Sequence, residues 1–262
     1  MAKIGTLFSS SSGNCSIVSS NNETILIDVG ASAKRILNSL SESNIALENI
    51  KGIFITHTHS DHVKGLRTLL KKVNVPVYGS KETLGELILS GAITKNNTYF
   101  DMEDSPSFCF DMEVNFFRTS HDCVGSGGYQ ITLSDGQRVA VCTDLGVVTE
   151  TVRNNLLGCK AVILESNHDV GMLQSGCYPF ETKQRILGEK GHLSNQTAAN
   201  ELQGLIKSGT TSVLLAHLSR DNNTPELARV SAEAALLSVG AKNNEDYILS
   251  IAPAEGAKML WM

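Results

Sequence analysis

Three histidines and an aspartate fall within six positions of one short segment of the chain. Residues 54–65 read FITHTHSDHVKG, and the four side chains are His57, His59, Asp61 and His62. The apolar residues before them predict a buried strand, and the residues after them predict a helix. The segment is therefore expected to be a loop at the carboxyl end of a strand, where open α/β folds place their functional residues.

The types and spacing of these side chains predict metal binding. Side chains two positions apart in an extended backbone face the same way, so His57 and His59 can bind one ion together. Asp61 and His62 lie where the chain turns into the helix and would point to a neighbouring position, which predicts two ions roughly 3.5 to 4 Å apart. The alternative is a loop of solvated polar residues, which four ligand types in six positions make the weaker interpretation.

Length and composition favour a soluble, enzyme-sized protein. The chain has 262 residues, of which 41% are hydrophobic and 19% charged, enough for one large core. No segment approaches the roughly 18 apolar residues of a membrane span, and the N-terminus has no apolar stretch of signal-peptide length. Six cysteines occur singly, without a C-x-x-C pair. We therefore expect reduced, mostly buried cysteines in a cytoplasmic protein that does not contact membranes.

Strands and helices are expected to alternate along the chain. Apolar runs predict strands at residues 24–30, 52–56, 75–80, 113–120, 127–144, 160–166, 212–217 and 247–252. Asp135-Gly136 predicts a hairpin turn within the fifth of these runs. Helices are predicted at residues 31–43, 63–72, 81–91, 195–208 and 225–239. This order predicts an α/β protein with two packed sheets and outer helices, forming a single domain over residues 1–262 built of two similar halves.

The residues and their order resemble the metallo-β-lactamase superfamily. The superfamily motif H-x-H-x-D-H is matched in full by His57, His59, Asp61 and His62, and the resemblance covers essentially the whole chain. Further signatures follow apolar runs in the same chain order, at Asp28, His121, Asp144 and His217. The resemblance implies a four-layer αβ/βα sandwich, the metallo-β-lactamase fold, with a dinuclear metal site.

The resemblance also implies how the ligands are shared between two divalent ions. One ion is expected on His57, His59 and His121, and the other on Asp61, His62 and His217. Asp144 is expected to bridge them, and Asp28 to orient the site through hydrogen bonds. Histidines with carboxylates suit zinc, manganese or iron, so the metal stays open. Two ions would bring the formal charge of −5 to about −1, so an acidic chain can still accept a polyanion.

Four segments look like one branch of the superfamily. They read FSSSSGNCSIV, LESNHD, GHLSNQTAA and AHLSRDNNTPELA. Together they resemble the YycJ group, also called WalJ or VicX, which consists of small bacterial cytosolic proteins regarded as DNA exonucleases acting from the 5′ end. The resemblance implies a dinuclear metal-dependent phosphodiesterase that cleaves DNA with metal-activated hydroxide.

His192 and Glu165 are candidate catalytic residues, as is the ligand Asp61. His192 matches a histidine that helps protonate the leaving oxygen in nuclease relatives, with a carboxylate at the position of Glu165 holding it. Phosphodiester hydrolysis leaves an alkoxide that must gain a proton, so this role is chemically reasonable. The alternative is a histidine in a turn before a helix that Ser194 caps.

Substrate contacts are less constrained by the sequence. Ser194 and the amides after it could bind a phosphate at a helix N-terminus, and His168 either touches substrate or fills a loop. Arg220 is a candidate phosphate contact, although a lone arginine is more often a surface residue. The run containing Ser12 and Asn14 is either a flexible turn or part of the cleft lining.

Other functions remain open from the sequence. A small-molecule metallohydrolase acting on thioesters, lactams or cyclic phosphodiesters would use the same metal site, although Glu165 and His192 have less purpose where a thiolate leaves unaided. The sequence does not decide between DNA and RNA, the direction of cleavage, or the oligomeric state.

Overall fold

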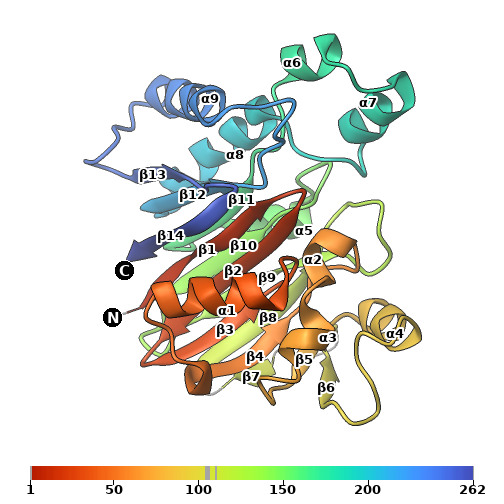
Figure 1. Cartoon of the computed structure of the whole chain (residues 1–262). Helices are drawn as coiled ribbons and strands as arrows, with labels where there is room; N and C mark the ends of the chain where they lie inside the picture. Colours follow the sequence, from red (N-terminus) through yellow and green to blue (C-terminus); the bar gives the residue numbers. More distant parts are fainter. Residues whose placement is uncertain (1, 104–106, 110, 262) are drawn as a thin grey trace.

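The computed structural model describes residues 2–103, 107–109 and 111–261. Within these residues it forms two seven-stranded sheets that face each other, with helices on their outer faces (Figure 1). This arrangement confirms the predicted α/β sandwich. The core between the sheets includes Phe54, stacked on Tyr78 at 4.3 Å between ring centroids, and Tyr129, which packs edge-on against Phe54.

The strands of the first sheet are, in spatial order, β14 (Glu255–Trp261), β1 (Lys3–Ser10), β2 (Gly13–Ser20), β3 (Glu23–Ile27), β4 (Ile50–Phe54), β5 (Val77–Gly79) and β6 (Tyr99–Asp101). Those of the second sheet are β7 (Ser107–Cys109), β8 (Met112–Arg118), β9 (Gly127–Thr132), β10 (Arg138–Cys142), β11 (Ala161–Glu165), β12 (Ser212–Ala216) and β13 (Ile248–Ile251). In the first sheet the strands from β14 to β3 pair antiparallel, and those from β3 to β6 pair parallel. In the second sheet the strands from β7 to β10 pair antiparallel, and those from β10 to β13 pair parallel.

Amphipathic helices cover the outer faces of the sheets. Helices α1 (Ala33–Glu42), α3 (Leu66–Leu69) and α4 (Lys81–Leu89) pack their apolar side chains on the first sheet. A short 3₁₀ helix, Leu47–Asn49, lies between α1 and β4 in the chain. Helices α5 (Glu150–Leu156), α8 (Asn195–Lys207) and α9 (Pro225–Ser238) cover the second sheet. Each fully buried aliphatic side chain contributes roughly 1.5–3 kcal/mol, so these outer cores hold the strand ends in fixed positions.

The predicted helix at residues 63–72 is wrong. The structure has two short helices instead, α2 (Ser60–Val63) and α3, separated at Gly65. The Gly65 N–H donates to the Val29 carbonyl at 2.8 Å, and a Cβ at this position would lie 2.3 Å from the Ala31 carbonyl oxygen. The chain is therefore drawn against the segment after β3, which interrupts the helix.

Other predicted elements agree with the structure to within a few residues. The Asp135-Gly136 turn joins β9 and β10, with Gly136 at φ +81° and the Leu133 N–H donating to the Gln137 carbonyl. Several elements were not predicted from the sequence: the β1–β2 hairpin, the strands β6, β7 and β14, and the helices α5, α6 (Val170–Ser175) and α7 (Phe180–Leu187). Helices α6 and α7 project from the rest of the molecule (Figure 1).

Two predictions from composition also have outcomes. The six cysteines are free and four of them are buried, as expected. Among the described residues, the structure has no helix with the length and apolarity that a membrane crossing requires.

Candidate functional site

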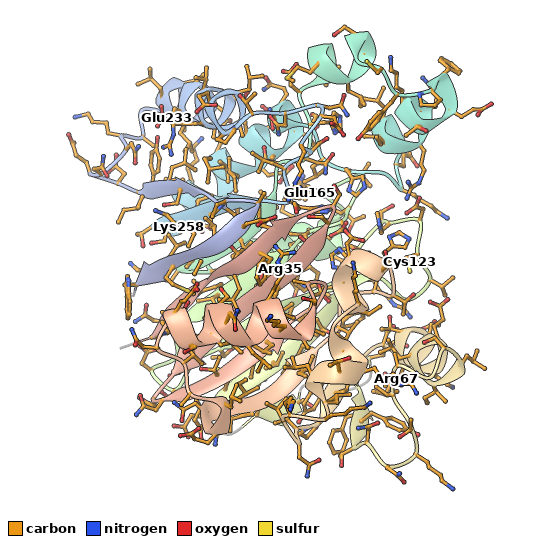
Figure 2. All side chains as sticks on the ribbon, viewed as in Figure 1. Arg35, Arg67, Cys123, Glu165, Glu233 and Lys258 are labelled. Atoms are coloured by element: carbon orange, nitrogen blue, oxygen red, sulfur yellow. The ribbon has the colours of Figure 1, made fainter. Side chains whose placement is uncertain are left out.

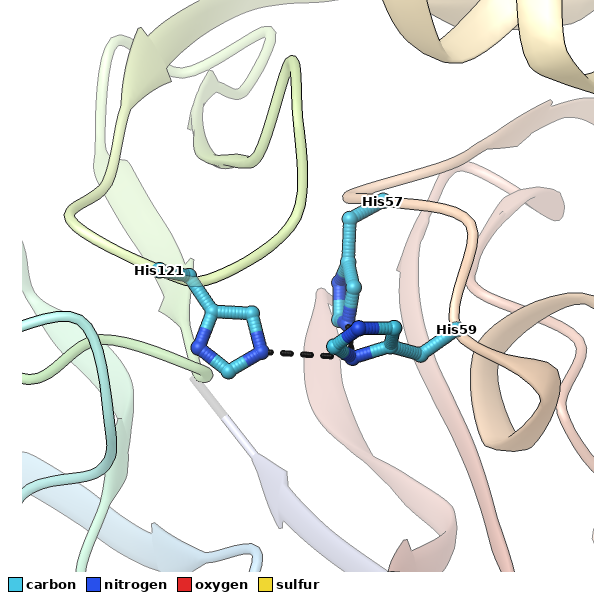
Figure 3. A group of neighbouring side chains, drawn as sticks. All are labelled: His57, His59 and His121. Carbon is cyan, nitrogen blue, oxygen red and sulfur yellow. Dashed lines mark hydrogen bonds between the residues drawn. The ribbon is translucent and has the colours of Figure 1, made fainter. Parts of the chain in front are cut away.

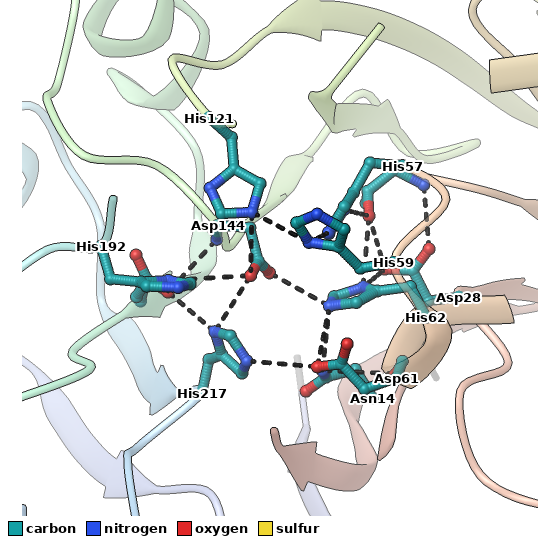
Figure 4. A network of polar contacts seen from close by, with 12 residues as sticks. Asn14, Asp28, His57, His59, Asp61, His62, His121, Asp144, His192 and His217 are labelled. Atoms are coloured by element: carbon teal, nitrogen blue, oxygen red, sulfur yellow. Dashed lines mark hydrogen bonds and ion pairs between the residues drawn. The ribbon is translucent and has the colours of Figure 1, made fainter. Parts of the chain in front are cut away.

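The candidate site lies where strands of both sheets end. The loops after β3 and β4 contribute from the first sheet, and the ends of β8, β10, β11 and β12 contribute from the second. Six of the seven histidines of the chain meet there, within one network of polar contacts (Figure 4). Segments far apart in the sequence are thus brought together by the facing sheets.

The loop after β4 is positioned by the neighbouring strand. His59 is the residue before α2, and Asp61 lies in the first turn of that helix, where a carboxylate is favoured. Gly30 lies against this turn, and a Cβ there would come within 1.5 Å of the Asp61 carbonyl oxygen. The absence of a side chain at Gly30 therefore allows the loop to fold back over the end of β3.

The first group of candidate ligands contains His57, His59 and His121 (Figure 3). His59 Nδ1 lies 3.1 Å from His57 Nε2 and 3.3 Å from His121 Nε2. Burial and the surrounding imidazoles lower the pKa of His57 well below its ordinary value. That histidine is therefore neutral, the form in which an imidazole binds a metal.

The second group contains Asp61, His62 and His217, and Asp144 lies between the two groups. Asp144 Oδ2 is 3.4 Å from His62 Nε2, and Asp144 Oδ1 is 3.9 Å from His121 Nε2. Burial lowers the pKa of His62, but the carboxylates of Asp144 and Asp28 outweigh burial and raise it to about 9. The structure thus brings together all seven predicted ligands.

The orientation of the histidine rings tests whether the site fits a metal. In four of the histidines Nδ1 lies close to a protein oxygen and Nε2 faces the group. The Nδ1 partners are Thr56 Oγ1 for His57, Asp28 Oδ2 for His62, the Gly191 carbonyl for His121 and Glu165 Oε1 for His217. A protein acceptor on the other ring nitrogen is the usual arrangement of metal-binding histidines, because it fixes the tautomer and the ring.

Unpaired polar atoms point to the same conclusion. Asp144 Oδ2 and His217 Nε2 are buried and have no hydrogen-bond partner among the described residues. A buried polar atom without a partner costs about 1–3 kcal/mol, and such atoms are uncommon in folded proteins. A cation between them would supply the missing partner, so the donor set fits divalent metal ions.

The backbone at three of these strand ends has an unusual conformation. Asp28, Asp144 and His217 have φ values of +60°, +60° and +56°. This left-handed region is sparsely populated by residues other than glycine and typically costs about 1–3 kcal/mol per residue. Asp28 uses it to accept from the Thr56 N–H at 2.9 Å and from the His62 ring at 2.7 Å.

Glu165 and His192 form a pair beside the candidate ligands. Glu165, labelled in Figure 2, lies at the end of β11 and is fully buried. Its carboxylate accepts from His192 Nδ1 at 2.9 Å and from the Leu193 N–H at 2.9 Å. Burial raises the pKa of Glu165, but the two imidazoles on it, His192 and His217, outweigh burial and hold the pKa well below its ordinary value. Burial lowers the pKa of His192, and the Glu165 carboxylate outweighs it and raises the pKa.

A cavity of about 300 Å³ opens on this cluster. Its lining includes the predicted residues His59, Asp61, Asp144, His192 and His217. It also includes residues that the sequence analysis missed: Ser11, Asn167, Tyr178, Thr182, Arg185, Ile186 and Ser219. Four of these come from α7 and the segment before it, a helix without a buried residue. The helix has only eight residues, fewer than the window of about 11–18 residues over which hydrophobic periodicity is read, so the sequence did not reveal it.

The weaker candidates occupy different places. Asn14 donates from Nδ2 to Asp61 Oδ2 at 3.2 Å, so it belongs to the site, whereas Ser12 is an exposed turn residue. Ser194 caps α8 by accepting from the Thr197 N–H. His168 is 1% exposed, burial lowers its pKa to about 4, and its ring nitrogens lack partners among the described residues. Arg220 lies outside the cavity lining, 3.3 Å from Glu255.

The comparison with protein families agrees with this geometry. A protein-family model described as Metallo-beta-lactamase superfamily matches residues 10–174 of the chain. The chain belongs to this superfamily. The metallo-β-lactamase fold protein YhfI from Bacillus subtilis has a similar structure, with a TM-score of 0.71, 15% identity and 98% of each chain covered. The superfamily fold and the histidine–aspartate groups together indicate divalent metal binding.

Two curated members of the superfamily are similar over most of the chain. The exodeoxyribonuclease YycJ of Bacillus anthracis is 36% identical over 236 residues, which are 89% of each protein. The exodeoxyribonuclease WalJ of Streptococcus pneumoniae is 33% identical over 233 residues, 87% of this chain and 86% of the relative. The predicted resemblance to the YycJ and WalJ group is therefore confirmed.

Proposed function

We propose that this protein is a metal-dependent exodeoxyribonuclease that hydrolyses DNA from its 5′ end and uses two divalent ions. The observation that carries the proposal is the Glu165–His192 pair beside the candidate ligands. When a phosphodiester is hydrolysed, the sugar oxygen leaves as an alkoxide that needs a proton. The relatives YycJ and WalJ are named as exodeoxyribonucleases, which supports the same assignment.

We assign His57, His59 and His121 to one ion and Asp61, His62 and His217 to the other, with Asp144 between them. When bound, the ions supply a deprotonated water and polarise the phosphate oxygens. Zinc, manganese and iron all suit this donor set.

The residues of the chain complete the reaction around that chemistry. Glu165 fixes the ring of His192 by accepting from Nδ1, and among the described residues Nε2 of His192 has no hydrogen-bond partner. His192 lines the cavity, so Nε2 can donate a proton to the departing sugar oxygen. Its raised pKa favours the protonated form that a general acid requires. Asp61, on the opposite group, can orient the attacking water.

The partner is expected to be DNA in the cytoplasm, which the free cysteines fit. The test is to incubate 5′-labelled and 3′-labelled DNA and RNA with protein loaded with zinc, manganese or iron. We expect stepwise release of mononucleotides from the 5′ end of DNA, and none after chelation. Hydrolysis of thioesters, lactams or cyclic phosphodiesters with intact DNA would instead assign a small-molecule hydrolase.

A further inference from the structure

Helix α7 and the segment before it form one wall of the cavity, the α7 wall, which contains Tyr178, Thr182, Arg185 and Ile186. Arg185 is the residue of interest on this wall. Among the described residues that line the cavity, it is the single lysine or arginine. Its Nε donates to Asp122 Oδ2, and no other partner of its guanidinium occurs among the described residues. Arginine carries five N–H donors, so the Nη groups are left to bind an anion. The carboxylate of Asp122 thus holds the arginine without using its outer donors.

Arg185 and His192 belong to one connected piece of structure. The His192 N–H donates to the Ile186 carbonyl at 3.0 Å, and the Gly191 N–H donates to the Gly188 carbonyl at 2.9 Å. Both side chains therefore face the cavity from the same wall. Because His192 is assigned to the leaving oxygen, this wall is the side on which the leaving part of the substrate lies.

The chemistry of the reaction identifies that leaving part. A water that has lost one proton to the solvent bonds through its oxygen to phosphorus, the bond from phosphorus to O3′ breaks with its electron pair on O3′, and His192 gives its proton to that oxygen. The phosphate then stays on the following nucleotide, and the nucleotide on the wall departs with a 3′-hydroxyl. The cavity of about 300 Å³ lies at the lower end of the size range of small-molecule pockets, about 300–1,000 Å³, which suits one nucleotide.

A single nucleotide that departs through O3′ is the 5′-terminal one. We propose that Arg185 binds the 5′-terminal phosphate of the DNA strand, and that the α7 wall thereby fixes both the 5′-to-3′ direction and the one-nucleotide step. Thr182, one helical turn from Arg185, and Tyr178 border the same space. This inference rests on the proposed nuclease function and names its end-recognition residue.

The first test compares DNA strands that carry a 5′-phosphate or a 5′-hydroxyl. We expect the wild-type protein to prefer the phosphorylated end in kcat/KM. Arg185→Ala should reduce that preference by roughly 10- to 100-fold, the usual worth of a charge-assisted hydrogen bond, and Arg185→Lys should retain part of it. Arg153→Ala is the matched control, because Arg153 is similarly exposed and bonds Glu201 on the outer face of the second sheet.

A second readout does not depend on turnover. Binding of thymidine 5′-monophosphate to the metal-loaded protein should be tighter than binding of thymidine 3′-monophosphate or thymidine, and Arg185→Ala should remove the difference. Melting temperatures of the variants show whether they remain folded. A wild-type protein that degrades DNA with no preference for the 5′-phosphate, or an Arg185→Ala protein that keeps the preference, overturns this inference alone. Absence of any DNA hydrolysis overturns the proposed function.

Discussion

The connection from β4 to β5 and the connection from β11 to β12 occupy matching places in the two sheets, since each joins the second and third strands of a parallel run. The first spans residues 55–76 and contains the short helices α2 and α3, whereas the second spans residues 166–211 and contains α6, α7 and α8. The short connection carries four candidate ligands within six residues. The long connection carries His192 and the cavity wall instead.

From this difference we expect the short connection to bind metal and the long connection to contact the substrate. The short one holds its side chains close to the strand end, which suits the fixed geometry of a metal site. The long one lines the cavity, so it can place the proposed acid His192 and the arginine Arg185 where we expect the substrate. Variants of the first should lose metal, and variants of the second should keep metal and lose substrate handling.

Asp144→Ala should have the largest effect. Its carboxylate lies between the two ligand groups, so its removal should lower the metal content below the two ions per chain expected of the wild type and abolish hydrolysis. Elemental analysis of metal-replete protein measures the first effect, with Asp135→Ala in the exposed hairpin turn as control. A wild-type content of one ion or none would contradict the dinuclear assignment.

His59→Ala should abolish hydrolysis while leaving the fold largely intact. His59 belongs to the short connection, and its side chain is 36% exposed, so its removal leaves the sheet cores unchanged. Circular dichroism should match the wild type, and turnover of DNA should fall to background. Wild-type turnover in this variant would disprove the metal chemistry assigned to the short connection.

The same difference explains how much the sequence could predict. The dense motif at His57–His62 indicated a strand end and its candidate ligands directly, and Asp28, Asp144 and His217 each followed a recognisable apolar strand. The fold class followed from those strands. The helix break at Gly65 could not be predicted, because it depends on contact with a segment distant in sequence.

The cavity wall was also beyond reach of the sequence. Helix α7 has only eight residues, fewer than the window of about 11–18 residues over which hydrophobic periodicity is read, and the position of Arg185 depends on Asp122 from another loop. Arg220 was a candidate phosphate contact, with a surface residue as the alternative, and the structure pairs it with the exposed Glu255. The role of a charged residue depends on its neighbours in space, and tertiary packing determines those neighbours.

His192→Ala tests the long connection and should have the next largest effect. It should retain both ions and slow cleavage of DNA by roughly 10² to 10⁴, the usual contribution of a general acid. An activated ester such as bis-p-nitrophenyl phosphate has a leaving group that hardly needs a proton, so its rate should stay near that of the wild type.

Measuring both rates on one metal-loaded preparation makes this test internal. Equal losses on the two substrates would indicate a structural or binding role for His192. Loss of metal from this variant would break the proposed division between the connections. Unchanged DNA cleavage would make His192 a turn residue ahead of the α8 cap at Ser194.

Tyr178→Phe should have the smallest effect and sharpen the role of the wall. The Tyr178 hydroxyl donates to Asp221 Oδ2 at 2.7 Å, which ties the segment before α7 to the loop after β12. Net hydrogen bonds contribute about 0.5–1.5 kcal/mol, so KM for DNA should rise by less than about tenfold with kcat nearly constant.

Tyr178→Ala should raise KM further, because an aromatic ring that stacks on a base contributes about 1–3 kcal/mol. Tyr99→Phe, on the exposed strand β6, is the matched control. Equal KM values for the Phe and Ala variants would show that the tether matters and the ring does not, whereas a fall in kcat alone would mean that the wall positions His192 and does not hold the terminal nucleotide.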